Sequence, residues 1–219
     1  MHDSTTPAVR PRSQAATAGR ILDSGERLLQ LRGFNGFSYA DIAAELKITK
    51  ASLHYHFPSK AELGEALITR YAERFAAALT GIDVAAGDAP VKLAAYADLY
   101  AGVLRGQRMC LCGMLAAEYK TLPDAMRIAV VAFFDHNEVW LARVLQQGKR
   151  EGSIHFSGPA REAAQATLST LEGALLVARP YGDPTRFQTT ARRLLAALAT
   201  PASPVARTRR VQAVTARKS

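Results

Sequence analysis

Apolar residues recur at intervals of three and four positions along most of the chain, and glycine or proline falls between the runs. This spacing places an apolar stripe on one face of a helix. No run of alternating β-branched residues indicates a strand. The pattern therefore predicts an all-α protein, with helices over residues 17–31, 39–46, 50–56, 60–79, 90–105, 110–120, 123–150, 159–178 and 184–198.

Two short helices near the amino terminus are joined by a tight turn. Ser38 stands at the N-cap position of the first, and Asp41 places a carboxylate in its positive first turn. Lys47, Ile48 and Thr49 form the turn, and Thr49 is suited to cap the second helix. This is a helix-turn-helix pattern, in which the second helix enters the DNA major groove.

The helix-turn-helix segment is dense in hydrogen-bond donors, which are Ser38, Tyr39, Thr49, Lys50, Ser52, His54, His56 and Lys60. A hairpin that only packs on its neighbours does not need so many exposed donors, so the pattern favours a nucleic-acid surface. The net charge of +9 agrees with a polyanionic partner. Residues 1–60 carry 8 basic and 5 acidic side chains, residues 61–199 carry 15 and 14, and residues 200–219 carry 5 and none.

Composition excludes several other classes of protein. No apolar run approaches the roughly 18 residues that span a bilayer, and the first twenty residues lack an apolar leader segment. Two cysteines are too few for a disulfide framework or a zinc site. We expect a soluble protein of the cytoplasm with no membrane partner, no metal and no cofactor.

The stretch from Phe37 to Leu63 reads F-S-x-x-x-I-A-x-x-L-x-I-T-K-x-S-L-H-Y-H-F-x-x-K-x-x-L and resembles the DNA-binding domain of TetR/AcrR-family transcriptional repressors. The resemblance covers about residues 17–65. It implies an all-helical dimer with an N-terminal three-helix DNA-binding head and a C-terminal helical body for ligand binding and dimerisation. The domains expected are a flexible basic arm (1–16), the head (17–62), the body (63–199) and a disordered basic tail (200–219). Lys47 and Ala51 stand where glycine is common in the family, so either Lys47 adopts a left-handed conformation at a modest cost or the turn differs slightly.

The resemblance also implies roles in DNA binding. The base-edge neighbours are then Tyr39, Lys50, Ala51 and Ser52. The phosphate contacts are Ser38, Thr49, His54, His56 and Lys60, and Tyr55 packs on a thymine methyl or on the DNA backbone. Three arginines, Arg10, Arg12 and Arg20, either reach the DNA from the N-terminal arm or belong to a leader without a role.

Two features of the body point to its function. In the family the last two helices form the dimer interface, here residues 159–178 and 184–198. The effector-binding candidates are Cys110, Tyr96, Tyr100, Met114, Phe133 and Trp140. Such residues suit an apolar pocket and equally suit a plain core. Glu118, Glu172 and His136 are the polar groups that such a pocket would use.

Cys110 stands at the expected start of a helix, close after Arg105 and Arg108. A helix N-terminus and nearby cations stabilise a thiolate, so Cys110 rather than Cys112 is the expected reactive thiol. The stretch 109–118 also resembles a subgroup of these repressors that senses electrophiles through a cysteine. The alternative is that both cysteines are small buried hydrophobes.

The prediction is therefore a repressor that binds a palindromic operator as a homodimer and is released by a small-molecule or electrophile effector. A ligand-independent architectural DNA-binding protein is the alternative. An enzyme that uses Cys110 and His136 is disfavoured, because no orienting third group or oxyanion site accompanies them.

Overall fold

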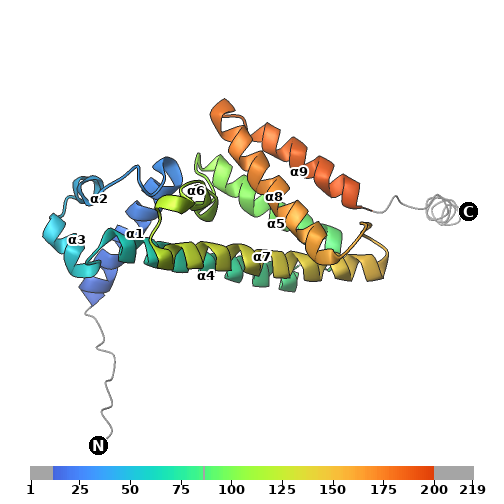
Figure 1. The fold of residues 1–219 in the computed structure, drawn as a ribbon, viewed down its shortest axis with the longest axis horizontal. Coiled ribbons are helices and arrows are strands. Elements are labelled where there is room, and N and C mark those ends of the chain that lie inside the picture. Colours follow the sequence, from blue (N-terminus) through green and yellow to red (C-terminus); the bar gives the residue numbers. More distant parts are fainter. Residues whose placement is uncertain (1–11, 86, 200–219) are drawn as a thin grey trace, which may run out of the picture.

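Figure 1 shows the computed structural model of the chain, which describes residues 12–85 and 87–199. Within these ranges the one β contact is an isolated bridge between Ile154 and Ala199, so the all-α prediction is confirmed. The helices are α1 (Arg12–Arg32), α2 (Tyr39–Leu46), α3 (Lys50–His56), α4 (Lys60–Ala85), α5 (Ala89–Arg105), α6 (Leu111–Ala117), α7 (Asp124–Glu151), α8 (Ala160–Ala178) and α9 (Pro184–Leu198), with short 3-10 helices at Tyr119–Thr121 and Arg179–Tyr181.

Helices α1, α2 and α3 form a head at one end of the molecule, beside the first turns of α4 (Figure 1). The bounds of α2 and α3 are those that the sequence predicts. Asp41 Oδ2 accepts a hydrogen bond from the Ser38 amide at 2.8 Å, and Thr49 Oγ1 accepts one from the Ser52 amide at 3.2 Å. Lys47 has φ 55°, so of the two alternatives for this turn the structure has the left-handed residue. Local capping therefore defines both helices.

Helix α1 begins at Arg12, earlier than the predicted Thr17. Residues 12–16 contain neither glycine nor proline, so the helix continues back into the segment expected as a flexible arm. Residues 1–11, which include Arg10, and the predicted tail 200–219 lie outside the described residues.

Helix α4 continues past its predicted end at Leu79 and through Gly81. Tertiary contacts hold the extra turns: Ile82 is buried, and Asp83 Oδ2 accepts a hydrogen bond from Trp140 Nε1 at 3.0 Å. These contacts outweigh the cost of about 1 kcal/mol for glycine in a helix. Because α4 begins in the head and ends in the body, it joins the two.

The body is a bundle of the remaining helices. In Figure 1 α4 and α7 run side by side along its length, and α9 is outermost, against α8 and α5. Its core contains fully buried leucines such as Leu93, Leu141, Leu145 and Leu175. None of the described helices combines the length and apolar character that a bilayer crossing requires.

Helix α6 is shorter than the predicted helix 110–120. Cys110 is its N-cap and not its first turn, and the chain changes to a 3-10 turn after Glu118. The Glu118 carboxylate accepts hydrogen bonds from the backbone amides of Phe34 and Asn35 in the head. The end of α6 is thus set by contact with the head.

Candidate functional site

The outer face of α3 carries most of the predicted DNA contacts. The exposed ones on and around it are Ser38, Thr49, Lys50, Ala51, His54 and Tyr55, with Ser52 half-buried beside them. The Tyr55 side chain is 65% exposed, although it is a large aromatic residue. On the opposite face Leu53 is fully buried and fixes α3 to the head. The helix therefore presents an ammonium group, hydroxyls, an imidazole and a phenol to solvent.

Two residues that were predicted to contact DNA, Tyr39 and His56, are buried in the head instead. The Tyr39 hydroxyl is shared between the carbonyl oxygens of Phe57 and Ser59, each at 2.7 Å, and burial raises the pKa of Tyr39 to about 12. His56 is buried, and its Nδ1 atom has no hydrogen-bond partner among the described residues. The predicted base-edge role of Tyr39 and phosphate role of His56 do not fit these positions.

Lys60 is also engaged within the protein. Its ammonium donates hydrogen bonds to the carbonyl oxygens of Phe34 and Phe37 and lies 4.6 Å from the centroid of each ring. Burial lowers the pKa of this ammonium group. The predicted phosphate contact is therefore corrected to a structural one: Lys60 holds the turn between α1 and α2.

Arg20 was expected to reach DNA from the N-terminal arm. It lies within α1, and its Nη2 atom donates a hydrogen bond to the carbonyl of Leu46 at 3.2 Å. Leu46 is the last residue of α2, so Arg20 stabilises the start of the helix-turn-helix turn.

The predicted aromatic residues of the effector site do meet in the body. They form one connected cluster of rings from α4, α5 and α7, which comprises Tyr71, Phe75, Tyr96, Tyr100, Phe133 and Trp140. Tyr96 stacks on Trp140 at 5.4 Å, and its hydroxyl donates to Asn137 Oδ1 at 3.0 Å. Met114 is placed elsewhere: it is half-buried, and its sulfur accepts a hydrogen bond from Arg179 Nη1 at 3.0 Å.

Cys110 lies beside this cluster but is not an exposed thiol. Its side chain is 0% exposed, its Sγ atom accepts a hydrogen bond from the Gly113 amide at 3.4 Å, and the Tyr71 hydroxyl is 3.7 Å away. Burial, and next the charge of Glu172, raises the pKa of the Cys110 thiol well above its usual value. Arg108 is directed to Gln30 instead. The expected thiolate is therefore wrong, because burial outweighs the helix N-terminus.

Of the three candidate polar groups, Glu172 is buried at the cluster and His136 lines the pocket beside Phe75 and Phe133. Glu118 caps backbone amides of the head, and His136 is exposed, with its Nδ1 atom 2.6 Å from the Ala132 carbonyl. Burial raises the pKa of the Glu172 carboxyl to about 7, although Cys110 and Tyr100 lie beside it and favour its charged form.

A pocket of about 360 Å³ opens between α4 and α7. Its walls are mostly apolar and include Phe75 and Phe133 of the ring cluster, with His136, Asn137 and Glu73 as polar members. A mostly apolar cavity with a few polar groups is typical of a small-molecule site.

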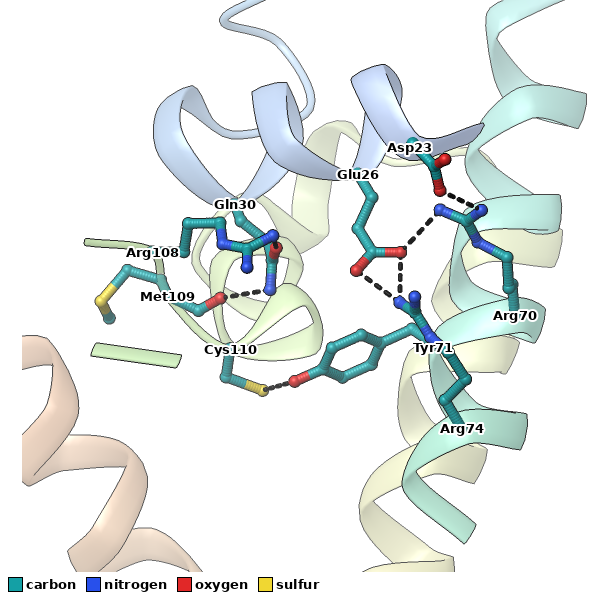
Figure 2. A network of polar contacts seen from close by, with 9 residues as sticks. All are labelled: Asp23, Glu26, Gln30, Arg70, Tyr71, Arg74, Arg108, Met109 and Cys110. Carbon is teal, nitrogen blue, oxygen red and sulfur yellow. Dashed lines mark hydrogen bonds and ion pairs between the residues drawn. The ribbon is translucent and has the colours of Figure 1, made fainter. Parts of the chain in front are cut away.

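Polar contacts join the head to the body near Cys110 (Figure 2). The Glu26 carboxylate of α1, which is buried, pairs with Arg70 and Arg74 of α4. Gln30 Nε2 donates to the carbonyl of Met109, the residue before Cys110, at 2.9 Å. This junction was not predicted from the sequence. The one indication in the sequence is that the polar residues Glu26 and Gln30 stand among the apolar positions of α1.

A helix-turn-helix head with an exposed polar recognition helix, joined to a helical body, defines a DNA-binding transcriptional regulator. The chain belongs to the TetR family. Residues 21–67 match the model of bacterial regulatory proteins of the tetR family, and residues 89–194 match that of the tetracyclin repressor-like C-terminal domain.

Individual relatives agree with this assignment. A TetR-family transcriptional regulator from Agrobacterium tumefaciens is 32% identical, with a TM-score of 0.83 over 85% of this chain and 100% of that one. The HTH-type transcriptional repressor NemR of Escherichia coli strain K12 is 26% identical over 170 residues, which are 74% of this chain and 84% of NemR. The HTH-type transcriptional repressor DhaR of Mycobacterium sp. strain GP1 is 24% identical over 157 residues, 71% of this chain and 79% of DhaR.

Proposed function

We propose that the protein is a cytoplasmic repressor that binds a pseudo-palindromic operator as a homodimer and leaves it when a small-molecule effector binds in the body. The observation that carries the DNA-binding part is the exposed face of α3. Lys50 at its first position is suited to donate to guanine O6 and N7, and Thr49 is suited to hold a phosphate oxygen. Ala51 and Tyr55 complete the surface that would face the bases and the backbone.

Dimerisation through α8 and α9 accounts for apolar surface that a monomer would leave in water. Leu176 and Val177 near the end of α8 are 57% and 59% exposed. On α9, Leu194, Leu195 and Leu198 are only partly buried. A two-fold axis through these helices would place two heads on the two halves of a palindromic site.

The junction of Figure 2 suggests how the body acts on the head. Helix α6 is held to the head at both ends, by Gln30 at the Met109 carbonyl and by Glu118 at the amides of Phe34 and Asn35. An effector that displaces α6 would change the orientation of the head. Release then follows if the effector binds more tightly to the displaced state than to the operator-binding state.

The test is selection of bound duplexes from a random DNA library with the full chain, followed by affinity measurements over a range of salt concentrations. We expect a pseudo-palindromic consensus, and Lys50→Ala should relax the preference at one position of each half-site. Lys120→Ala, at an exposed lysine of the body, is the matched control and should leave the consensus unchanged. Selection of no consensus at all, or an unaltered consensus with Lys50→Ala, would contradict the proposed recognition surface.

A further inference from the structure

Glu172 is a carboxylate without a cationic partner in the interior of the body. Its Oε1 atom is buried and makes no hydrogen bond to any described residue. Its Oε2 atom lies against the first turn of α6, only 2.6 Å from the point where a Cβ atom on Gly113 would stand. Hydrogen bonds from Cys110 and Tyr100 reach the carboxylate, so it has neutral donors beside it, while Oε1 retains unused capacity to accept a hydrogen bond.

The groups around Glu172 are neutral when it is charged. The titratable side chains that face it are Tyr71 of α4, Tyr96 and Tyr100 of α5, and Cys110 and Cys112 at α6. Among the described residues, no lysine or arginine contributes to the shift of the pKa of Glu172. An unpaired buried carboxylate is costly, so its persistence here requires an explanation other than stability.

We propose that this cluster is a binding site for a small organic cation, with Glu172 as the counter-ion and the side chains of Tyr71, Tyr96 and Tyr100 as the surrounding wall. Aromatic faces attract cations through their negative electrostatic potential, and the attraction is strongest where water is excluded. A carboxylate inside an aromatic wall combines charge pairing with this attraction. The inference rests on the proposed function in one respect: it names the chemical class of the effector.

The pocket between α4 and α7 is the nearest opening to this cluster, and Phe75 separates the two. Phe75 lines the pocket and also contacts Tyr96 and Tyr100, at ring-centroid distances of 6.1 and 5.9 Å. Asn137, another pocket residue, accepts a hydrogen bond from Tyr96, whose hydroxyl is 3.1 Å from that of Tyr100. A ligand with an apolar body would occupy the pocket, and its ammonium group would reach Glu172 only by displacing the Phe75 ring.

The site lies where binding would be transmitted to DNA. Cys110, which faces Glu172, caps α6, and the preceding carbonyl of Met109 accepts the hydrogen bond from Gln30 of the head. An ammonium group that draws Glu172 away from α6 would disturb this contact.

The experiment compares 2-phenylethylammonium with its neutral counterpart 2-phenylethanol by calorimetry on the full chain. The wild type should bind the cation about tenfold more tightly at pH 8 than at pH 6, because Glu172, with a pKa of about 7, is charged at pH 8 while the alkylammonium stays charged throughout. Glu172→Gln should weaken cation binding by about tenfold or more at pH 8 and leave the alcohol unaffected. Glu162→Gln, at an exposed glutamate on the same helix, is the matched control.

Three outcomes would overturn the proposal: no binding of the cation, equal binding of the alcohol, or dependence on Glu73→Gln at the pocket wall in place of Glu172→Gln. Operator binding is measured separately on the same samples. If the protein selects an operator but does not bind the cation, the proposed function stands and the cation site is refuted. If the protein binds the cation but selects no operator, the proposed function is refuted.

A second measurement needs no ligand. The folded-state pKa of Glu172 lies above the value of about 4.5 for an unperturbed glutamate. Ionisation of this carboxyl therefore lowers the free energy of unfolding as the pH rises from about 4.5 through 7. Glu172→Gln should therefore raise the melting temperature at pH 8 and have a smaller effect at pH 5. A lower melting temperature for the variant at pH 8 would show that the carboxylate is partnered in the fold, and the proposal would fail.

Discussion

Helices α3 and α6 have seven residues each, and the same local device begins both. In α3 the Thr49 hydroxyl accepts a hydrogen bond from the Ser52 amide, and in α6 the Cys110 sulfur accepts one from the Gly113 amide. The two helices nevertheless have opposite surroundings. Helix α3 lies on the surface with its polar side in water, whereas Leu111, Cys112 and Leu115 of α6 are all fully buried.

The difference teaches that a cap position does not set the chemistry of the capping residue. Thr49 is exposed to solvent, so its hydroxyl is not desolvated by the fold. Cys110 occupies the equivalent position, but the desolvation of a thiolate in the core exceeds the stabilisation that a short helix N-terminus supplies. The polar face of α3 stays exposed on the surface of the head. Helix α6, in contrast, connects the head to the body.

The largest contrast is expected in stability. Leu115→Ala in α6 should lower the free energy of unfolding by about 2–5 kcal/mol, because it leaves a cavity in the core. Tyr55→Ala in α3 should change it by about 0.5 kcal/mol or less and instead weaken DNA binding. Urea unfolding followed by the fluorescence of Trp140, the chain's single tryptophan, measures both values. Similar losses for the two variants would mean that α3 is as enclosed as α6.

A second contrast concerns two lysines of the head. Lys60→Met keeps the aliphatic stem but removes the hydrogen bonds to Phe34 and Phe37, so it should cost about 1–3 kcal/mol of stability. The salt dependence of DNA binding should not change. Lys50→Met should leave stability unaltered and reduce the slope of log affinity against log salt by about one contact. The reverse pattern would restore Lys60 as a phosphate contact.

The thiol of Cys110 offers a third test. Its burial and raised pKa predict that iodoacetamide alkylates it at least about tenfold more slowly than a free cysteine peptide at pH 7. Cys112 should behave similarly, and urea should abolish the protection of both. Mass spectrometry of the modified peptide gives the two rates. A rate for Cys110 above that of the peptide would favour a thiolate at the helix start.

The smallest effects are expected at the turns that precede the two helices. Lys47 before α3 and Gln107 before α6 both have φ 55°, a left-handed conformation that strains any residue with a Cβ atom. Lys47→Gly and Gln107→Gly should each raise stability by about 1 kcal/mol or less, since relief of strain is partly offset by glycine's greater entropy loss. Thermal melts compare the two, and a loss at either turn would show that its side chain contributes more than the strain costs.

Sequence alone determined the elements whose limits are local. The bounds of α2, α3 and α9 agree with the prediction. Each of these helices begins after a residue suited to cap it, respectively Ser38, Thr49 and Asp183. The left-handed conformation of Lys47 is one of the two alternatives that the family's usual glycine left open at this position. The exposed face of α3 also followed, because apolar Leu53 marks its buried side and the polar residues take the other.

Tertiary structure decided what each polar side chain faces. Lys60 and Lys50 are indistinguishable by residue type, yet two carbonyls and two rings enclose the first and water surrounds the second. The raised pKa of the Cys110 thiol and the unsatisfied Oε1 atom of Glu172 have a common cause. Both depend on four helices that come from distant parts of the chain and pack together. Periodicity shows which face of a helix is buried, but desolvation and pairing depend on the atoms opposite that face, and only the packed fold places them there.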